Sequence, residues 1–430
     1  MPAHAVTVVR PPMVYPRAGG GTPTISSPTG NGHDGHGPKL SIAMVAACPY
    51  PARRGTPIRI HRLAEGMAGR GHDVHVVTYH FGSSDDAPTL SVHRIPSIGS
   101  YRKLAPGPTY VKLGLLDPLL TLKLWQVLRK FRVDIIHAHH FEGLLVSAAA
   151  RFWSRKPLIF DAHTLLTSEL PFYRLGLPLR AKQRIAAALD RRLPGMADHV
   201  ITVTERIRER LLQIGAVQSD KVSVVPNGVE SQFFFENGNG EGKVTNGGPT
   251  LIFTGNLAPY QGIDLMLRAL RKVLNRRSDV RLKIVTESSF AHYDALAREL
   301  GVAGSIEVVR AQFEEIPRLL AGATVAVNPR MDCDGIPVKL LNYMAAGKPV
   351  LSFASSAPVV RHRQTGWLVA DGDIDGFAEG ALTLLGNAEL AGALGQNARQ
   401  LVRDQHDWGR STELAEGIYR RVIRERANPE

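Results

Sequence analysis

Apolar and polar positions alternate along this chain with two different periods, and the two periods follow one another repeatedly. Short runs rich in β-branched residues, such as residues 40–47, 73–79 and 133–138, have the period of strands. Residues 58–70 have apolar positions three and four apart, the period of a helix, and end at Gly71. Strands and helices in alternation predict an α/β protein with a mostly parallel, doubly wound sheet.

The alternation stops once and then starts again. Residues 231–248 are rich in Gly and Asn, which is typical of a flexible linker. We therefore predict two Rossmann-like α/β domains, over residues 39–230 and 249–405, that face each other across a cleft. Small ligands bind preferentially in such clefts.

Composition agrees with two domains. A chain of 430 residues with 44% apolar content can bury two substantial cores. Residues 1–38 are rich in Pro and Gly and contain no apolar h-region, so we expect a disordered tail and not a signal peptide. The only cysteines are Cys48 and Cys333, which suits a reducing cytoplasm and excludes a disulfide framework.

Positive charge is concentrated in the first half of the chain. Residues 1–230 hold 29 Lys plus Arg against 16 Asp plus Glu, whereas residues 231–430 hold 23 of each. The stretches 101–132 and 173–192 combine basic with apolar residues, so they could lie on an anionic membrane surface or form ordinary amphipathic helices. We expect no nucleic-acid partner, because aromatic residues are few and no known binding module is present.

Residues 323–353 predict a ligand site. A β-branched run is followed by a polar loop, a short helix and a second apolar run, and the N-terminus of such a helix favours an anion such as a diphosphate. Asp334 lies at the start of the predicted helix, Lys339 in about its first turn and Asn342 further along. They offer an acceptor, a cation and an amide.

The segment DGIPVKLLNYMAAGKPV (residues 334–350) resembles the signature of the family 4 glycosyltransferases, retaining enzymes of the GT-B fold. Asp334 and Asn342 stand where the family has two Glu. The segments VDIIHAHH, VITVTERIRERL, VVPNGVE and TGWLVADGDIDGFAEGALTLL resemble further family segments in the family's order. The resemblance implies an acceptor-side first domain, a nucleotide-sugar-binding second domain, and a last helix, residues 406–430, that crosses back to the first domain.

The same resemblance assigns residues of the first domain. His139 matches the second His of an H-x-H pair that contacts the transferring sugar; the alternative is a group of solvated loop histidines. His163 could line the acceptor pocket or be a hydrogen-bonded core residue. Gly55 and Thr56 are expected in the loop after the first strand, with Gly55 near the donor phosphates and Thr56 on the acceptor side, or else in a simple turn.

Two basic residues that bind the donor phosphates in the family are missing from this chain. Asn256 and Gln261 stand where the family has Arg and Lys, and losing two such charges weakens diphosphate binding by several kcal/mol unless others replace them. Lys339 and Arg330 are the candidate replacements, together with the backbone near Ile336.

These features lead to one functional hypothesis. We expect a cytoplasmic enzyme, with a peripheral position on the inner membrane face left open, that transfers a sugar from a nucleotide-sugar donor to a lipid-linked or saccharide acceptor with retention. Asp334 would hold sugar hydroxyls, and we expect no metal and no cofactor. The run Asp332-Cys333-Asp334 looks like a metal-binding Asp-x-Asp, but three-residue matches are common by chance. The alternatives are a degenerate GT-B protein that binds sugars or partners without turnover, and an epimerase of nucleotide sugars.

Overall fold

The structure is a computed structural model, and it describes residues 37–52, 55–82, 90–99, 109–173, 176–230, 233–234, 248–331 and 335–428. Asp334, nearly all of the predicted tail and most of the predicted linker lie outside these ranges. Two compact units make up the chain, residues 1–159 and residues 160–430.

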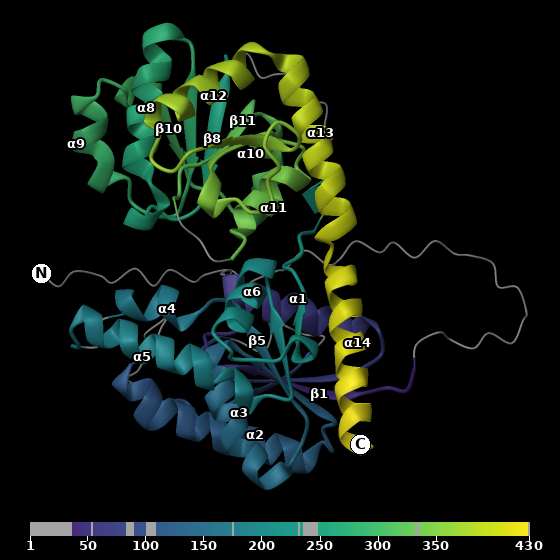
Figure 1. The fold of residues 1–430 in the computed structure, drawn as a ribbon. Coiled ribbons are helices and arrows are strands. Elements are labelled where there is room, and N and C mark those ends of the chain that lie inside the picture. The colour runs from purple at the N-terminus through teal and green to yellow at the C-terminus, as the bar shows by residue number, and fades with distance from the viewer. Residues whose placement is uncertain are drawn as a thin grey trace, which may run out of the picture. The chain divides into compact units, whose positions relative to one another are not determined.

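The described strands form two sheets in which neighbouring strands run parallel (Figure 1). The first sheet has seven strands in the order β3-β2-β1-β4-β5-β6-β7. Its strands are β1 (Ser41–Ala46), β2 (Asp73–Thr78), β3 (Ser91–Arg94), β4 (Ile135–His139), β5 (Leu158–Ala162), β6 (His199–Thr202) and β7 (Val222–Val224).

The second sheet has six strands in the order β10-β9-β8-β11-β12-β13. Its strands are β8 (Thr250–Thr254), β9 (Arg281–Val285), β10 (Ile306–Val309), β11 (Val325–Asn328), β12 (Val350–Phe353) and β13 (Gly366–Val369). In both sheets the strand order reverses beside the first strand, so both are doubly wound, as the alternating pattern predicts.

Helices connect the strands. In the first half they are α1 (Gly55–Gly69), α2 (Asp117–Lys130), α3 (His140–Ser154), α4 (Leu166–Glu169), α5 (Leu179–Arg192) and α6 (Glu205–Gln213). In the second half they are α8 (Ile263–Arg276), α9 (Ala291–Glu299), α10 (Ile316–Ala321), α11 (Val338–Ala345), α12 (Ile374–Gly386), α13 (Ala388–Gln405) and α14 (Trp408–Ala427). A π-helical turn, Lys112–Leu116, leads into α2.

One expectation about α1 is wrong. Gly55 and Thr56 are the first two residues of this helix and not part of the preceding loop. Pro57 allows the early start, because proline lacks the N–H that has no partner in a helix's first turn.

Two hydrophobic cores cover the two faces of the six-stranded sheet. Alternate strand residues point to opposite sides: Leu251 and Phe253 pack in the core with α8 and α12, while Ile252 packs in the core with α11 and α13. Because both faces are buried at the centre of the sheet, strands β8, β11 and β12 consist almost entirely of buried residues, most of them apolar.

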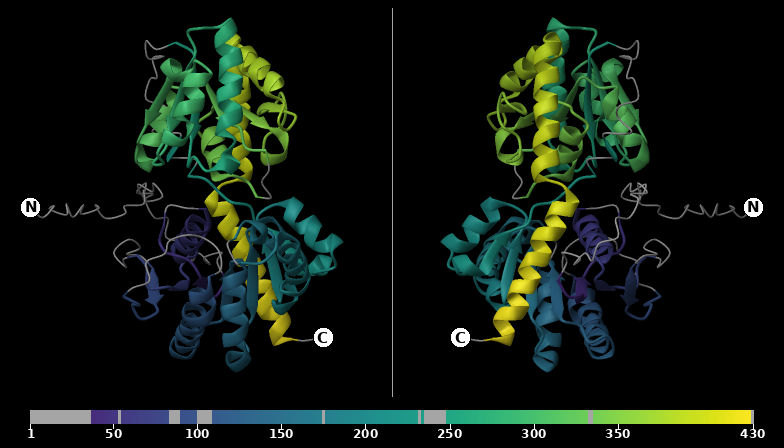
Figure 2. Two further views of the ribbon diagram at one scale, coloured as in Figure 1. Left: turned by 90° about the vertical axis from the view of Figure 1, so that its left-hand side faces the viewer. Right: turned by 90° about the vertical axis from the view of Figure 1, so that its right-hand side faces the viewer.

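The last helix, α14, returns to the first sheet (yellow in Figure 2). Arg426 Nε lies 3.2 Å from Asp198 Oδ1, and Arg421 donates to a ring nitrogen of His199 in β6 at 3.1 Å. Near its start, Ser411 donates to the carbonyl of Pro226 at 2.9 Å. These contacts confirm the predicted return of the C-terminal helix.

Candidate functional site

A group of polar side chains lies at the reversal point of the six-stranded sheet. Strands β8 and β11 are parallel neighbours there, and the loops that follow them, together with the start of α11, supply the group. The carboxyl ends of strands at such a reversal point are where α/β proteins bind ligands.

Lys339 is the second residue of α11 and lies at the centre of this group. Its Nζ donates to Oε1 of Gln261 at 2.7 Å and lies 4.2 Å from the centroid of the Phe253 ring. Both contacts come from the segment that contains and follows β8. They hold the ammonium in place at the start of α11.

Gln261 and Asn256 continue the group. Asn256 Oδ1 accepts a long hydrogen bond from Gln261 Nε2, at 3.5 Å, and a shorter one from the backbone N–H of Ala258, at 3.1 Å. Asn256 Nδ2 donates to the hydroxyl of Tyr260 at 3.1 Å. The two neutral residues that stand in for cations therefore orient other polar groups.

Arg330 reaches the same loop from β11. Its guanidinium carbon lies 4.9 Å from the centroid of the Tyr260 ring. The structure thus brings together Lys339, Arg330, Gln261 and Asn256, which the sequence places in three separate segments.

The close approach of the two loops depends on Gly262. Its φ is +70°, and a Cβ at this position would lie 2.1 Å from the carbonyl oxygen of Pro329. Only glycine fits both the left-handed backbone and the contact.

Among the described residues, no side chain caps the N-terminus of α11. Pro337 occupies the N-cap position, and Ile336 before it is partly buried. An uncapped N-terminus presents backbone N–H groups and a partial positive charge, which favour an anion. Asn342 lies one turn beyond Lys339, partly buried, and no described group hydrogen bonds to its side-chain amide.

Sequence reasoning missed the buried groups that hold this loop. Asn328 ends β11, and its Nδ2 donates to the hydroxyls of Ser352 and Ser356, each at 2.9 Å. Ser356 in turn donates to the carbonyl of Arg330 at 2.5 Å. A polar residue closing the apolar run VAVN was the available signal, because a buried amide needs partners.

Tyr343 of α11 forms a further link to β8. Its hydroxyl accepts a hydrogen bond from the backbone N–H of Thr254 at 2.7 Å. Burial raises the pKa of Tyr343 to about 12, so the hydroxyl stays protonated and acts as a structural donor and acceptor.

At the reversal point of the first sheet, His139 ends β4 and pairs in register with Ala46 of β1. It is buried, and its ring centroid lies 4.1 Å from that of His137. His140 follows with a positive φ of 64°. His139 and His137 are therefore not solvated loop residues.

His163 lies just after β5 and is buried. Its Nε2 is 3.8 Å from Oδ1 of the buried Asp161. This separation is too long for a hydrogen bond, so the acceptor-pocket role and the hydrogen-bonded core role of His163 both stay predictions. His137, His139 and Asp161 are residue types that bind divalent metals, and the metal-independent reaction expected from the sequence stays a prediction.

A buried polar network lies after β1, β2 and β4, and no sequence pattern predicted it. Tyr79 donates to Asp117 Oδ1 at 2.5 Å, and Lys112 Nζ lies 3.5 Å from Glu142 Oε1. Burial is the main cause that raises the pKa of Asp117 to about 6, and burial together with Glu142 raises that of Cys48 to about 12. The thiol therefore stays protonated at neutral pH.

Comparison with known families tests the resemblance seen in the sequence. A family model described as Glycosyltransferase Family 4 matches residues 53–233, and one described as Glycosyl transferases group 1 matches residues 248–387. The chain belongs to the family 4 glycosyltransferases. Together the two matches include every site residue predicted from the sequence, and the resemblance seen in the sequence is confirmed.

Relatives of this glycosyltransferase are distant. It is 26% identical over 445 residues to a D-inositol 3-phosphate glycosyltransferase of Acidothermus cellulolyticus, covering 91% of this chain and 95% of the relative. Among solved structures, sucrose-phosphate synthase from Thermosynechococcus elongatus superposes with a TM-score of 0.72 at 18% identity, covering 90% of this chain and 99% of that one.

A second structural neighbour was solved with a nucleotide. HepE of Anabaena in complex with UDP has a TM-score of 0.69 and 18% identity, and the match covers 88% of this glycosyltransferase and 99% of HepE. These similarities show the GT-B fold, as predicted.

Proposed function

We propose that this glycosyltransferase transfers a sugar from a nucleotide-sugar donor to a lipid-linked or saccharide acceptor, with retention of configuration and without a metal. The observation that carries the proposal is the position of Lys339, held by Gln261 and Phe253 at the N-terminus of α11. HepE, which shares the fold, binds UDP, and this supports a nucleoside diphosphate as the donor's leaving group.

The leaving group is the part of the donor that this site suits best. A diphosphate carries its charge on several oxygens, and Lys339, Arg330 and the backbone N–H groups near Ile336 provide two cations and a helix N-terminus. As the bond from the anomeric carbon to the phosphate oxygen breaks, negative charge grows on the diphosphate. Stabilising that charge is the main catalytic contribution we assign to these residues.

The transfer step uses the negative charge that grows on the departing diphosphate. The acceptor oxygen bonds to the anomeric carbon on the face that the diphosphate leaves, and the departing phosphate takes the acceptor's proton. We assign Asp334 to the sugar hydroxyls and His139 to orienting the reacting centre, with Thr56 and His163 on the acceptor side. These four assignments rest on the family resemblance.

Donor binding tests the proposal. Titration with UDP- and GDP-sugars should give micromolar binding of one donor and slow release of its nucleotide in water. Replacing Lys339 with Ala should weaken that binding by at least about tenfold, because the cation nearest the helix N-terminus is lost.

Lys272→Ala is the matched control. Lys272 lies on α8 in an exposed ion pair with Asp375, and such pairs contribute little. Donor affinity that is unchanged in Lys339→Ala, or lowered equally in both variants, would remove Lys339 from the site.

A protein that binds sugars without turnover is the second candidate. The neutral side chains of Asn256, Gln261 and Asn342 favour it, because each stands where the family has a charged residue. Donor binding without any release of nucleotide, in the presence of a broad acceptor set, would support this candidate over the enzyme.

A further inference from the structure

Helices α2 and α3 lie side by side (Figure 1), and both expose apolar side chains to solvent. Phe152 and Trp153 at the end of α3 are 82% and 65% exposed, and Leu122 of α2 is 49% exposed. Single exposed apolar residues are common in proteins, but clustered ones mark binding surfaces.

The exposed residues follow the helix period. On α3, Leu145, Ala149 and Phe152 are four and three residues apart and therefore share one face, and Trp153 lies beside them. Leu144, Val146 and Ala150 of the same helix are buried. The helix is thus apolar both toward its own domain and toward solvent, unlike an ordinary amphipathic helix.

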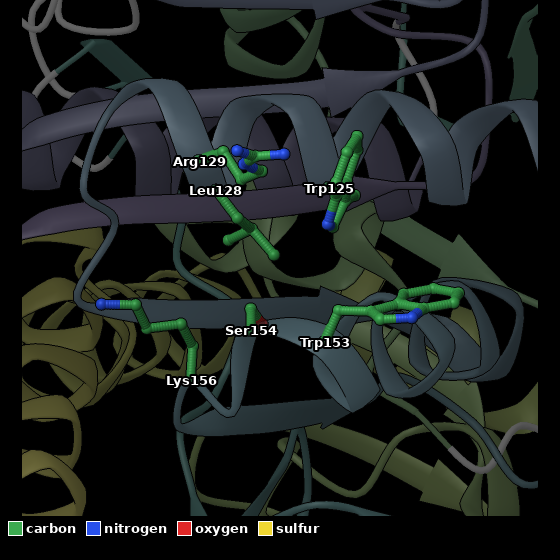
Figure 3. A pocket seen from close by; sticks show the side chains of 6 residues that line it. All are labelled: Trp125, Leu128, Arg129, Trp153, Ser154 and Lys156. Atoms are coloured by element: carbon green, nitrogen blue, oxygen red, sulfur yellow. The ribbon is translucent and has the colours of Figure 1, made fainter.

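A pocket of about 400 Å³ opens between the ends of these two helices (Figure 3). Its lining comes from the last turns of α2, the end of α3 and the segment that follows. The lining residues are Trp125, Leu128, Arg129, Trp153, Ser154 and Lys156. Arg129 lies over the Trp125 ring, with its guanidinium carbon 4.9 Å from the ring centroid.

The charged residues that line the pocket, Arg129 and Lys156, are both basic. Residues 118–133 and 143–160, which are bounded by Asp117, Asp134, Glu142 and Asp161, contain seven Lys plus Arg. Basic residues at a helix C-terminus interact favourably with the helix dipole, but this does not account for aromatic side chains exposed beside them. A surface with tryptophan, exposed aliphatic residues and a basic pocket is complementary to the interface of an anionic bilayer.

We propose that this glycosyltransferase docks on anionic phospholipid membranes through the α2–α3 face, formed by Leu122, Trp125, Arg129, Phe152, Trp153 and Lys156. Phe152 and Trp153 enter the interface between headgroups and acyl chains, and Arg129 and Lys156 bind lipid phosphates. Every helix in the described part of the chain is too short or too polar to span a bilayer, so the contact is peripheral. The inference deepens the proposed function and rests on it for a lipid-linked acceptor.

Vesicle binding tests the docking directly. The full chain should co-sediment with phosphatidylcholine vesicles that contain phosphatidylglycerol, and the bound fraction should fall as salt is raised. Each cation near an anionic surface contributes about 1 kcal/mol, so Arg129→Gln with Lys156→Gln should lower the partition coefficient about 30-fold.

Arg268→Gln with Arg318→Gln is the matched control. Both residues are exposed on helices of the six-stranded sheet, and the change in net charge is the same. The control should bind as the unchanged protein does, and equal losses in both double variants would overturn the proposed surface.

Tryptophan fluorescence supplies a second readout. Anionic vesicles should shift the emission to the blue, and Trp153→Phe should remove most of that shift. Equal binding to pure phosphatidylcholine would overturn the role of charge. Self-association without lipid that is lost in Phe152→Ser with Trp153→Ser would assign the surface to a second copy of the chain and overturn membrane docking.

The membrane docking and the proposed function can be tested separately. Donor titration needs no membrane, and vesicle binding needs no donor. Donor binding without vesicle binding would refute the docking alone, whereas vesicle binding without donor binding would refute the enzyme alone.

Discussion

At the residue scale, Gln261 and Asn256, which stand where the family has cations, have a structural role. Gln261 cannot supply the positive charge found there in the family, but its amide oxygen accepts the hydrogen bond that positions Lys339. Asn256 likewise orients Tyr260, whose ring lies beside Arg330. The neutral side chains at positions 261 and 256 therefore contact Lys339 and the aromatic neighbour of Arg330.

Two substitutions at Gln261 distinguish its role in positioning Lys339 from the effect of a charge at this position. Gln261→Ala should raise the donor Kd several-fold, because Lys339 loses the partner that orients it. Gln261→Glu should raise it further, by at least about tenfold, because a carboxylate 2.7 Å away would neutralise Lys339 and repel the diphosphate.

Isothermal titration of the three proteins with one donor is the measurement. A Glu variant that binds at least as tightly as the Ala variant would show that charge at this position does not reach the donor. It would also weaken the assignment of Lys339.

At the element scale, the site depends on how closely two loops approach. The loop after β8 and the loop after β11 are brought together by parallel neighbouring strands, and Gly262 permits the contact with Pro329. The start of α8 immediately after Gly262 makes this turn part of the support of the site.

Gly262→Ala should therefore destabilise the protein by about 1–3 kcal/mol or more, through a strained φ and a clash with the Pro329 carbonyl. Gly392→Ala is the control, because Gly392 lies inside α13 with open space around it, and alanine there should be neutral or stabilising. Denaturant unfolding of both variants measures the effect. Equal stability of the two variants would contradict the argument.

At the scale of the whole molecule, the buried His199 and the half-buried His93 link stability to pH. Burial, followed by the charge of Arg421, lowers the pKa of His199 to about 4. Burial, followed by repulsion from His75, lowers that of His93 to about 4. His199 lies where α14 meets β6, and His93 lies at the β2–β3 pair, so both ends of the first sheet are affected.

The direction of the pH effect follows from these lowered pKa values. At these two histidines the unfolded chain binds more protons than the native one between about pH 6.5 and pH 4, and the raised pKa of Asp117 offsets this at one group only in part. The stability that these two histidines contribute is therefore present above about pH 6.5 and is lost as the pH falls toward 4. The melting temperature should decrease over that interval.

His199→Gln should make the melting temperature less dependent on pH over the same range, because glutamine cannot take up the proton that repels Arg421. His292→Gln, at an exposed position on α9, should leave the dependence unchanged. Calorimetry between pH 4 and pH 7 compares the three proteins. Parallel curves for all of them would rule out His199 as a source of acid sensitivity.

Much of the architecture could be predicted from the sequence, because the period of apolar residues is a local property. The β-branched run and the short helix within residues 323–353 and the return of the last helix were all expected and are present as β11, α11 and α14. The family signature also depends on short segments in a set order. Predicting these features requires no information about contacts between residues that are distant in the sequence.

The partners of the charged residues were decided by the tertiary structure alone. Lys339 and Gln261 are 78 positions apart, and they meet because β8 and β11 are neighbours in a doubly wound sheet. The network around Asp117 and the exposed face of α2 and α3 likewise depend on which helix face is covered. Sequence patterns show which residues are apolar or charged, whereas the strand order and the packing of helices determine which of them touch.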